Sequence, residues 1–193
     1  MNPGRFARVF FLSSLCLSIT AAAQQFDLFE IRDNDLYWHN TYKYGGNADS
    51  LRREVVTMLK SKYYTFNVIR NEAGYNGELH HYKVDCRKYG RRFFSTPRMY
   101  WDGEWSGKFV VEVFDNYYRV TVYALYAEKV EKTGYYKTER RTQGRYVEVI
   151  AKKDFSDFKS SELDNMALMS RSLKDQFDIR NTVSPVENSQ VRY

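Results

Sequence analysis

The strongest constraint on the fold is a stretch in which two runs rich in β-branched and aromatic residues are separated by a short polar turn. The runs are Lys108–Phe114 and Tyr117–Tyr126, and Asp115 and Asn116 lie between them. Residues of this kind favour strands, and a short Asp/Asn connection between two such runs is typical of a hairpin turn. The sequence therefore predicts an antiparallel β-hairpin and the sheet to which it belongs.

The first 23 residues have the three zones of an export signal in the right order. Arg5 and Arg8 give a positive start, Val9–Ile19 is an apolar core, and Ala21–Ala23 supplies small residues for cleavage. The apolar run is shorter than the roughly 20 residues of a permanent membrane-spanning helix. An uncleaved anchor or a buried first helix is the alternative. We expect residues 1–23 to be a signal peptide and the protein to be exported to the periplasm, the cell envelope or the outer surface.

Removal of this signal would leave 170 of the 193 residues and lower the formal net charge from +6 to +4, because Arg5 and Arg8 are lost. Cys86 would be the one remaining cysteine, so no intrachain disulfide could form. The sequence does not decide whether Cys86 is buried or paired with another chain. With 43% apolar residues, the chain suits one compact domain stabilised by its core. No later stretch is long and apolar enough to predict a transmembrane segment.

The other segments predict strands where apolar residues alternate and helices where they recur at helical spacing. The further predicted strands are Leu36–Tyr44, a strand beginning at Tyr64, Leu79–Cys86 and Arg145–Ala151; Asn71–Gly77 is a predicted turn, and Glu128–Gly144 a solvated hairpin extension or loop. The predicted helices run from Asn47 or Asp49 to Lys62, and from Ser160 or Ser161 to Phe177. Ser161 and the three residues after it fit a capping box.

This order predicts an α+β fold, a twisted antiparallel β-sheet with two helices packed on one face, in the order β-α-β-β-β-β-(β)-α. The opposite face must be wet or be covered by the segments Arg87–Gly107 and Glu128–Gly144. We assign residues 24–179 to a single α+β domain. Residues 180–193 are polar and have no period, so we expect a mobile polar tail.

The hairpin sequence FVVEVFDNYYRVTVYAL and the order of the preceding elements resemble a family of secreted bacterial domains of unknown function. Members carry a short strand, an Asp-Gly or Asp-Asn turn, and then Tyr-Arg-Tyr/Val-Thr. The matching residues are Asp115, Asn116, Tyr118, Arg119 and Thr121. The resemblance covers residues 26 to 127. It implies a fold like that of the TATA-box-binding protein and an envelope location, and it carries no known catalytic residue and no reason to expect DNA binding.

Catalytic and metal-binding signatures are mostly absent. After signal removal, the histidine and cysteine side chains would be His39, His80, His81 and Cys86. Neighbouring residues of a strand point to opposite faces, so His80 and His81 could not share a metal without a bulge. We therefore predict no metal site and no cofactor.

One segment, Cys86–Gly107, concentrates positive charge and aromatic rings. Guanidinium groups pair with phosphate or carboxylate, and rings stack, so the segment suits an anionic or glycan ligand. Export argues against nucleic acid and leaves envelope glycans, lipid head groups or an acidic protein. The alternative is packing, with rings on one sheet face and arginine stems over them. The candidate ligand-binding residues are Arg91, Arg92, Arg98, Tyr100, Trp101 and Trp105.

These observations favour an exported envelope binding domain without catalytic activity, which holds an anionic or glycan ligand at this segment. The alternative is a structural accessory subunit of an envelope complex, in which a sheet edge or the C-terminal helix docks an unidentified envelope protein. A third hypothesis is a hydrolase of envelope polymers. It requires Asp154, Asp157 or Glu104 to lie no more than one water molecule from His80 or His81.

Overall fold

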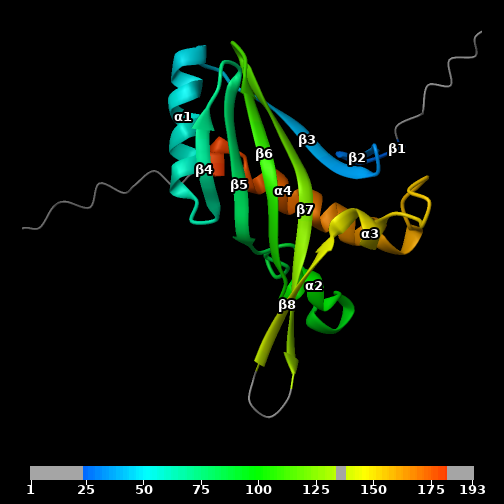
Figure 1. The fold of residues 1–193 in the computed structure, drawn as a ribbon. Coiled ribbons are helices and arrows are strands. Elements are labelled where there is room, and N and C mark those ends of the chain that lie inside the picture. The colour runs from blue at the N-terminus through cyan, green and yellow to red at the C-terminus, as the bar shows by residue number, and fades with distance from the viewer. Residues whose placement is uncertain (1–23, 134–137, 182–193) are drawn as a thin grey trace, which may run out of the picture.

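The computed structural model describes residues 24–133 and 138–181, which form an antiparallel sheet of eight strands with helices packed against it (Figure 1). The strands are β1 (Gln24–Phe26), β2 (Phe29–Arg32), β3 (Asp35–Lys43), β4 (Thr65–Arg70), β5 (Gly74–Tyr82), β6 (Glu104–Val113), β7 (Tyr117–Thr133) and β8 (Thr138–Arg145). The helices are α1 (Ala48–Ser61), α2 (Arg98–Trp101), α3 (Tyr146–Ile150) and α4 (Leu163–Gln176), with 3₁₀ turns η1 (Phe93–Ser95), η2 (Ser160–Glu162) and η3 (Ile179–Asn181). The sheet order is β1-β2-β3-β7-β6-β5-β4, and β8 pairs with β7. The predicted α+β class is confirmed.

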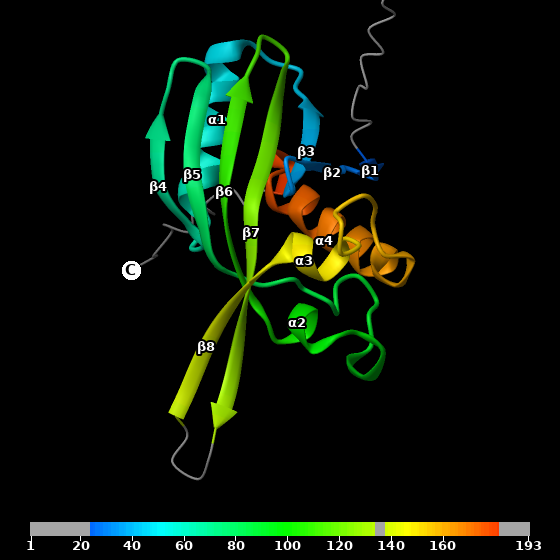
Figure 2. The same ribbon diagram turned by 45° about the vertical axis from the view of Figure 1, so that its right-hand side comes forward.

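The predicted hairpin is β6–β7, which lies inside the sheet. Val113 pairs with Tyr118, and the N–H of Phe114 donates to the carbonyl oxygen of Tyr117 (2.9 Å) to close the turn. β7 continues to Thr133, beyond its predicted end, and pairs with β8 in a second hairpin that projects from the sheet (Figure 2). The expected hairpin extension is therefore confirmed for the described backbone between residues 128 and 144.

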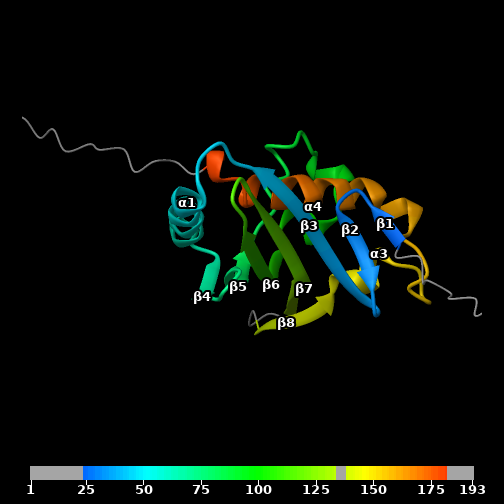
Figure 3. The same ribbon diagram turned by 90° about the horizontal axis from the view of Figure 1, so that it is seen from above.

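The two long helices, α1 and α4, cover the same face of the sheet, as predicted (Figure 3). α1 begins at the predicted cap, where Asn47 Oδ1 accepts the N–H of Ser50 (2.9 Å). Its buried side chains recur at helical spacing: Leu51, Val55, Met58 and Leu59. α4 begins at Leu163, and no side chain caps it, so the capping box predicted at Ser161 does not form.

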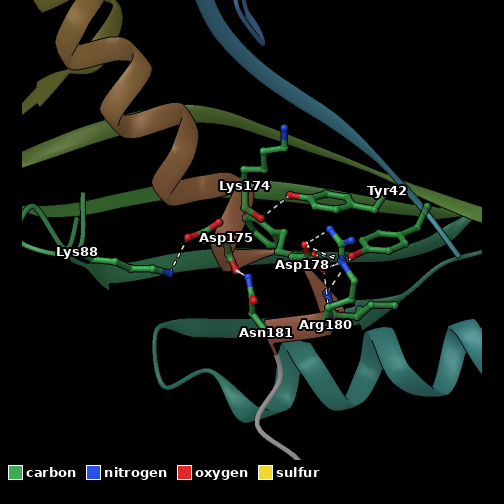
Figure 4. A network of polar contacts seen from close by, with 10 residues as sticks. Tyr42, Lys88, Lys174, Asp175, Asp178, Arg180 and Asn181 are labelled. Carbon is green, nitrogen blue, oxygen red and sulfur yellow. Dashed lines mark hydrogen bonds and ion pairs between the residues drawn. The ribbon is translucent and has the colours of Figure 1, made fainter. Parts of the chain in front are cut away.

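Tyrosines on the inner face of the sheet hold the end of α4 through hydrogen bonds, and Figure 4 shows the bond of Tyr42. The hydroxyl of Tyr42 donates to the carbonyl oxygen of Lys174 (2.9 Å), and that of Tyr118 donates to the carbonyl oxygen of Phe177 (2.7 Å). The last carbonyls of a helix have no partner within the helix, so these bonds satisfy a half-buried and a buried carbonyl that would otherwise lack a partner in the protein. Burial raises the pKa of both tyrosines.

The predicted strand Arg145–Ala151 is wrong, because this segment forms α3 after the last residue of β8. Tyr146, Val147 and Ile150 are buried, and their spacing is that of one helical turn. A segment this short satisfies both the strand pattern and the helix pattern. The choice is made by contacts with distant elements, such as the packing of Tyr146 against Phe29 (ring centroids 6.0 Å apart).

β5 begins inside the predicted turn Asn71–Gly77 and ends inside the predicted strand Leu79–Cys86, so both predictions lie too far along the chain. Gly77, taken as a turn residue, is inside β5 instead. A Cβ atom at Gly77 would lie 2.3 Å from the ring of Phe109 on β6. This glycine therefore allows the Phe109 ring to lie against the backbone of β5.

The predicted signal peptide 1–23 and residues 182–193 of the predicted tail lie outside the described residues. Arg180, at the start of that tail, belongs to η3, and its guanidinium donates to the Asp178 carboxylate (2.6 Å). Cys86 is buried, and its thiol donates to the carbonyl oxygen of Tyr100 (3.2 Å). Burial raises the pKa of this thiol.

Candidate functional site

The segment that concentrates charge and rings connects β5 to β6 and carries η1 and α2. It lies at the end of the sheet from which the β7–β8 hairpin leaves (Figure 1). The structure divides its side chains into three groups: core residues, residues that tie the segment to α4, and an exposed tip.

Tyr100 and Trp105, two of the predicted ligand-binding residues, have fully buried side chains. Their ring centroids lie 5.5 Å apart, and both rings contact Tyr146 of α3, whose hydroxyl accepts a hydrogen bond from Tyr100 (3.0 Å). Burial raises the pKa of Tyr100. We therefore correct the assignment of both residues from ligand binding to the core, because neither ring presents a surface to a ligand.

Arg91, a third predicted ligand-binding residue, is used within the fold. Its guanidinium forms an ion pair with the Asp164 carboxylate of α4 and donates to the Asp164 carbonyl oxygen (2.6 Å). The hydrogen bond from Arg91 holds the pKa of Asp164 below its usual range. Nearby, the hydroxyl of Tyr89 donates to the Asp175 carboxylate (2.9 Å). These contacts attach the segment to α4 and leave Arg91 in a positioning role.

The remaining predicted residues, Arg92, Arg98 and Trp101, gather with exposed rings at the tip of the segment. We define the loop patch as Arg87, Arg92, Phe93, Phe94, Arg98 and Trp101. Phe94 is 99% exposed and Phe93 is 41% exposed. The Phe93 ring centroid lies 5.4 Å from that of Phe94 and 5.5 Å from that of Trp101. Among the described residues, neither Arg92 nor Arg98 has an ion-pair partner.

Phe93 and Phe94 were not among the predicted ligand-binding residues, although the sequence around them contains a signal. The two rings are adjacent, follow two arginines and precede Pro97 in a segment that does not alternate. Rings in a segment without a period do not all face the core, and here both rings are exposed. An exposed apolar patch rimmed by polar residues marks a contact surface more often than a single exposed residue does.

A hollow of about 340 Å³ lies on the face of the sheet opposite the long helices. We call it the open-face hollow, and its lining side chains are Glu30, Arg32, Tyr37, His39, Glu112, Arg119 and Thr121. They come from β2, β3, β6 and β7, where they alternate with core residues such as Trp38 and Tyr118. Arg119 and Thr121 were predicted as hairpin residues, and nothing in the sequence groups them with the other lining residues.

β5 contains an irregularity between Leu79 and Tyr82, where His81 has a left-handed backbone (φ 54°). As a result, two consecutive residues, His80 and His81, lie between the buried side chains of Leu79 and Tyr82. This bulge invalidates the strict alternation from which we expected the two histidines to point to opposite faces.

The bulge brings His81 to an acidic partner. Its Nδ1 lies 2.7 Å from Glu104 Oε2, and Lys83 Nζ lies 3.1 Å from the other carboxylate oxygen. The hydrogen bond with His81 is the main reason that the pKa of Glu104 is lowered. His81, Glu104 and Glu128 each offer one possible metal ligand atom, and these three atoms lie within 4.8 Å of one another. Acidic groups often gather in this way without a metal, and Lys83 already supplies a cation, so the expectation of no metal site stays a prediction.

The hydrolase hypothesis requires a carboxylate near a histidine, and Glu104 meets this condition whereas the two aspartates are used elsewhere. Asp154 accepts the hydroxyl of Ser156 (2.7 Å), and Asp157 forms an ion pair with Lys152 (2.9 Å). These hydrogen bonds lower the pKa of both aspartates and shape the turn that precedes η2. The hydrolase hypothesis stays untested, and neither Glu104 nor His81 lines the open-face hollow.

No helix in the described ranges is long and apolar enough to cross a membrane. No protein-family model matches the sequence, and no curated protein matches it closely enough to count as a relative.

Two solved structures resemble the fold. One is a TBP-like protein from Parabacteroides distasonis, which is 11% identical, covers 79% of this chain and 97% of its own, and superposes with a TM-score of 0.41. The other is a DUF4468 family protein from Bacteroides ovatus, which is 10% identical, covers 83% of this chain and 85% of its own, and has a TM-score of 0.43. Neither assigns a role to any residue of this chain.

Proposed function

We propose that this chain is an exported binding domain of the bacterial cell envelope, without catalytic activity, and that the loop patch attaches it to an anionic lipid surface. The observation that carries the proposal is the ring of Phe94, which is 99% exposed in a patch that also holds Arg92 and Arg98. The proposal keeps the anionic ligand expected from the sequence and replaces the buried candidates by exposed ones.

Two physical terms favour a lipid surface over a soluble anion. Burying a phenylalanine side chain contributes roughly 1.5–3 kcal/mol, and the acyl boundary of a bilayer offers the apolar volume that a free phosphate lacks. Each arginine near an anionic surface adds about 1 kcal/mol. Aromatic side chains beside basic residues are typical of segments that lie in the interface of an anionic membrane.

The base of the patch is rigid, which reduces the entropy lost on binding. Thr96, between η1 and α2, is buried, and Tyr100 and Trp105 fix the following residues to the core. On the other side, Arg91 holds the segment to Asp164 of α4. The exposed rings of Phe93 and Phe94 therefore project from a base that is fixed on both sides.

Co-sedimentation with vesicles tests the proposal. We expect the protein to bind vesicles made of phosphatidylglycerol and phosphatidylcholine, and not to bind vesicles made only of phosphatidylcholine. High salt should release the bound protein. The double variant Arg92→Ser/Arg98→Ser and the single variant Phe94→Ser should each bind at least about tenfold more weakly, since 1.4 kcal/mol is a factor of ten.

The matched control is Arg53→Ser/Lys60→Ser, which removes the same charge from exposed positions of α1. This control should bind the mixed vesicles as the unmodified protein does. Equal binding by all variants, or no binding to the anionic vesicles, would reject the lipid surface. Binding to an acidic protein without binding to vesicles would assign the patch to a protein partner instead.

The accessory-subunit alternative is favoured by a separate observation, at the edge strand β4. Within the described residues β4 pairs with β5 alone. Phe66 and Ile69 are exposed on β4, and Tyr63 is exposed just before it. The other predicted docking element, α4, has most of its apolar side chains in the core. If this alternative holds, native mass spectrometry of the protein purified from its own envelope should detect a protein partner, and Ile69→Lys should remove it. A spectrum of the lone chain would count against it.

A further inference from the structure

The open-face hollow contains four charged side chains, and they neutralise one another in pairs. The Arg32 guanidinium donates to both carboxylate oxygens of Glu30 (2.9 and 3.1 Å), and Arg119 Nε donates to Glu112 Oε2 (2.8 Å). The pairs come from opposite sides of the hollow, since Glu30 and Arg32 lie on β2, Glu112 on β6 and Arg119 on β7. The lining therefore has no net formal charge when His39 is neutral.

This charge balance restricts the ligands that the hollow can take. A free anion would approach the carboxylates of Glu30 and Glu112, and a free cation would approach the two guanidinium groups. Either would lose part of its hydration without a net opposite charge to replace it. The hollow is therefore suited to an uncharged polar ligand.

Paired groups still have unused hydrogen-bonding capacity. A guanidinium carries five N–H donors and a carboxylate about four acceptor positions, of which each pair here uses one or two. Each pair therefore presents donors and acceptors side by side. A hydroxyl group both donates and accepts, so a ligand with several hydroxyls matches such pairs, whereas a ligand that only donates or only accepts does not.

The middle of the hollow offers further polar groups without internal partners. His39 on β3 is directly opposite Thr121 on β7, and both are half-buried. Within the described part of the chain, neither side chain makes a hydrogen bond or an ion pair. Beside them, the ring of Tyr37 is stacked on that of Tyr123 (centroids 6.0 Å apart, planes 16° apart). The Arg32 guanidinium also lies over the Tyr37 ring, 5.6 Å from its centroid, so this ring supports the Arg32–Glu30 pair.

We infer that the open-face hollow is a binding site for a neutral glycan, with its hydroxyls on the two Arg–Glu pairs, His39 and Thr121. The volume of about 340 Å³ falls in the range of small-molecule sites, roughly 300–1,000 Å³, so it accepts one or two sugar units of a longer chain. This site is separate from the loop patch and does not depend on the lipid surface proposed above.

A printed array of neutral and acidic oligosaccharides, probed with the purified protein, tests the inference. We expect retention on at least one neutral oligosaccharide and no preference for acidic ones. Thr121→Tyr fills the middle of the hollow with a ring that a strand accepts, and it should weaken binding at least tenfold. Lys43→Tyr places the same ring on an exposed position of β3 outside the lining and should bind normally.

A second variant tests the charge argument itself. Glu112→Gln keeps the shape of the side chain and leaves Arg119 without its charged partner, so binding should shift toward acidic oligosaccharides. The inference is overturned if the unmodified protein retains no neutral oligosaccharide, if it retains acidic ones alone, or if Thr121→Tyr binds as well as Lys43→Tyr. Arg92→Ser/Arg98→Ser separates the two proposals, because it should weaken vesicle binding at least about tenfold and leave glycan binding unchanged.

Discussion

Tyr118 and Phe177 are joined by a hydrogen bond that fixes the end of α4 to the long strand β7. The Tyr118 hydroxyl donates to the Phe177 carbonyl oxygen at 2.7 Å and accepts the N–H of Ile179 at 3.1 Å. The ring of Phe177 also packs on that of Phe109 of β6 (centroids 5.4 Å apart). The residues that follow α4, Phe177 to Ile179, are therefore attached to the sheet through both backbone and side chain.

Replacing Tyr118 by Phe tests this attachment. The change leaves the buried Phe177 carbonyl and the half-buried Ile179 N–H without their partner, and it should lower the free energy of unfolding by about 1–3 kcal/mol. Urea unfolding followed by circular dichroism measures the loss. Tyr117→Phe, one residue away on the other face, should cost less than about 0.5 kcal/mol, as surface changes do. Equal stability of the two variants would show that the bond contributes nothing.

Buried tyrosines make the fold sensitive to alkali. Burial is the main cause of a raised pKa for seven tyrosines, namely Tyr42, Tyr64, Tyr82, Tyr89, Tyr100, Tyr118 and Tyr146. An unfolded tyrosine ionises near pH 10. The stability from these groups is thus complete below about pH 10 and falls as the pH rises toward the higher folded values.

An alkaline titration that records tyrosinate absorbance and circular dichroism together checks this expectation. Part of the tyrosinate signal should appear only in the same cooperative step in which the secondary structure is lost. Smooth ionisation of all tyrosines with an unchanged dichroism spectrum would contradict it.

The hairpin and the two long helices could be predicted because their patterns run over many residues. The core position of Tyr100 could not be predicted, because the segment Cys86–Gly107 has no hydrophobic period and its partner Tyr146 lies 46 residues further along the chain. The bulge at His81 was invisible for a related reason, because no residue type marks it. The open-face hollow depends on the strand order, which puts β2 and β6 on either side of the β3–β7 pair. A local sequence pattern does not predict the order of the strands in the sheet.

The ion pair between Asp178 and Arg180, just after α4, makes the stability of the protein sensitive to acid. The hydrogen bond from Arg180 is the main cause that lowers the pKa of Asp178. A lowered folded pKa means that this contribution is present above the unfolded value, about 3.9, and is lost as the pH falls through the folded value. Asp178→Asn removes the contribution, so its stability should fall less steeply than that of the unmodified protein below about pH 4.

Urea midpoints across an acid series measure this difference, with Asp115→Asn in the exposed β6–β7 turn as the control. The control should follow the unmodified protein at every pH. Parallel curves for Asp178→Asn and the unmodified protein would mean that the pair does not contribute to stability.

Truncating Tyr100 and truncating Phe94, both in the segment Cys86–Gly107, should have different effects: the first on stability and the second on vesicle binding. Tyr100 is buried against Trp105 and Tyr146, so Tyr100→Ala should cost about 3–5 kcal/mol of unfolding free energy. Phe94 is exposed, so Phe94→Ala should leave stability within about 0.5 kcal/mol and reduce vesicle binding.

Thermal unfolding and vesicle co-sedimentation of the two variants separate packing from binding. Because a destabilised Tyr100→Ala protein could lose binding through unfolding, Tyr100→Phe provides the folded comparison: it keeps the ring, loses the bond to the Tyr146 hydroxyl, and should bind vesicles normally. A large loss of stability in Phe94→Ala would mean that this ring packs against the protein in solution. Weak vesicle binding by a folded Tyr100→Phe protein would instead return Tyr100 to the ligand-binding role from which its burial removes it.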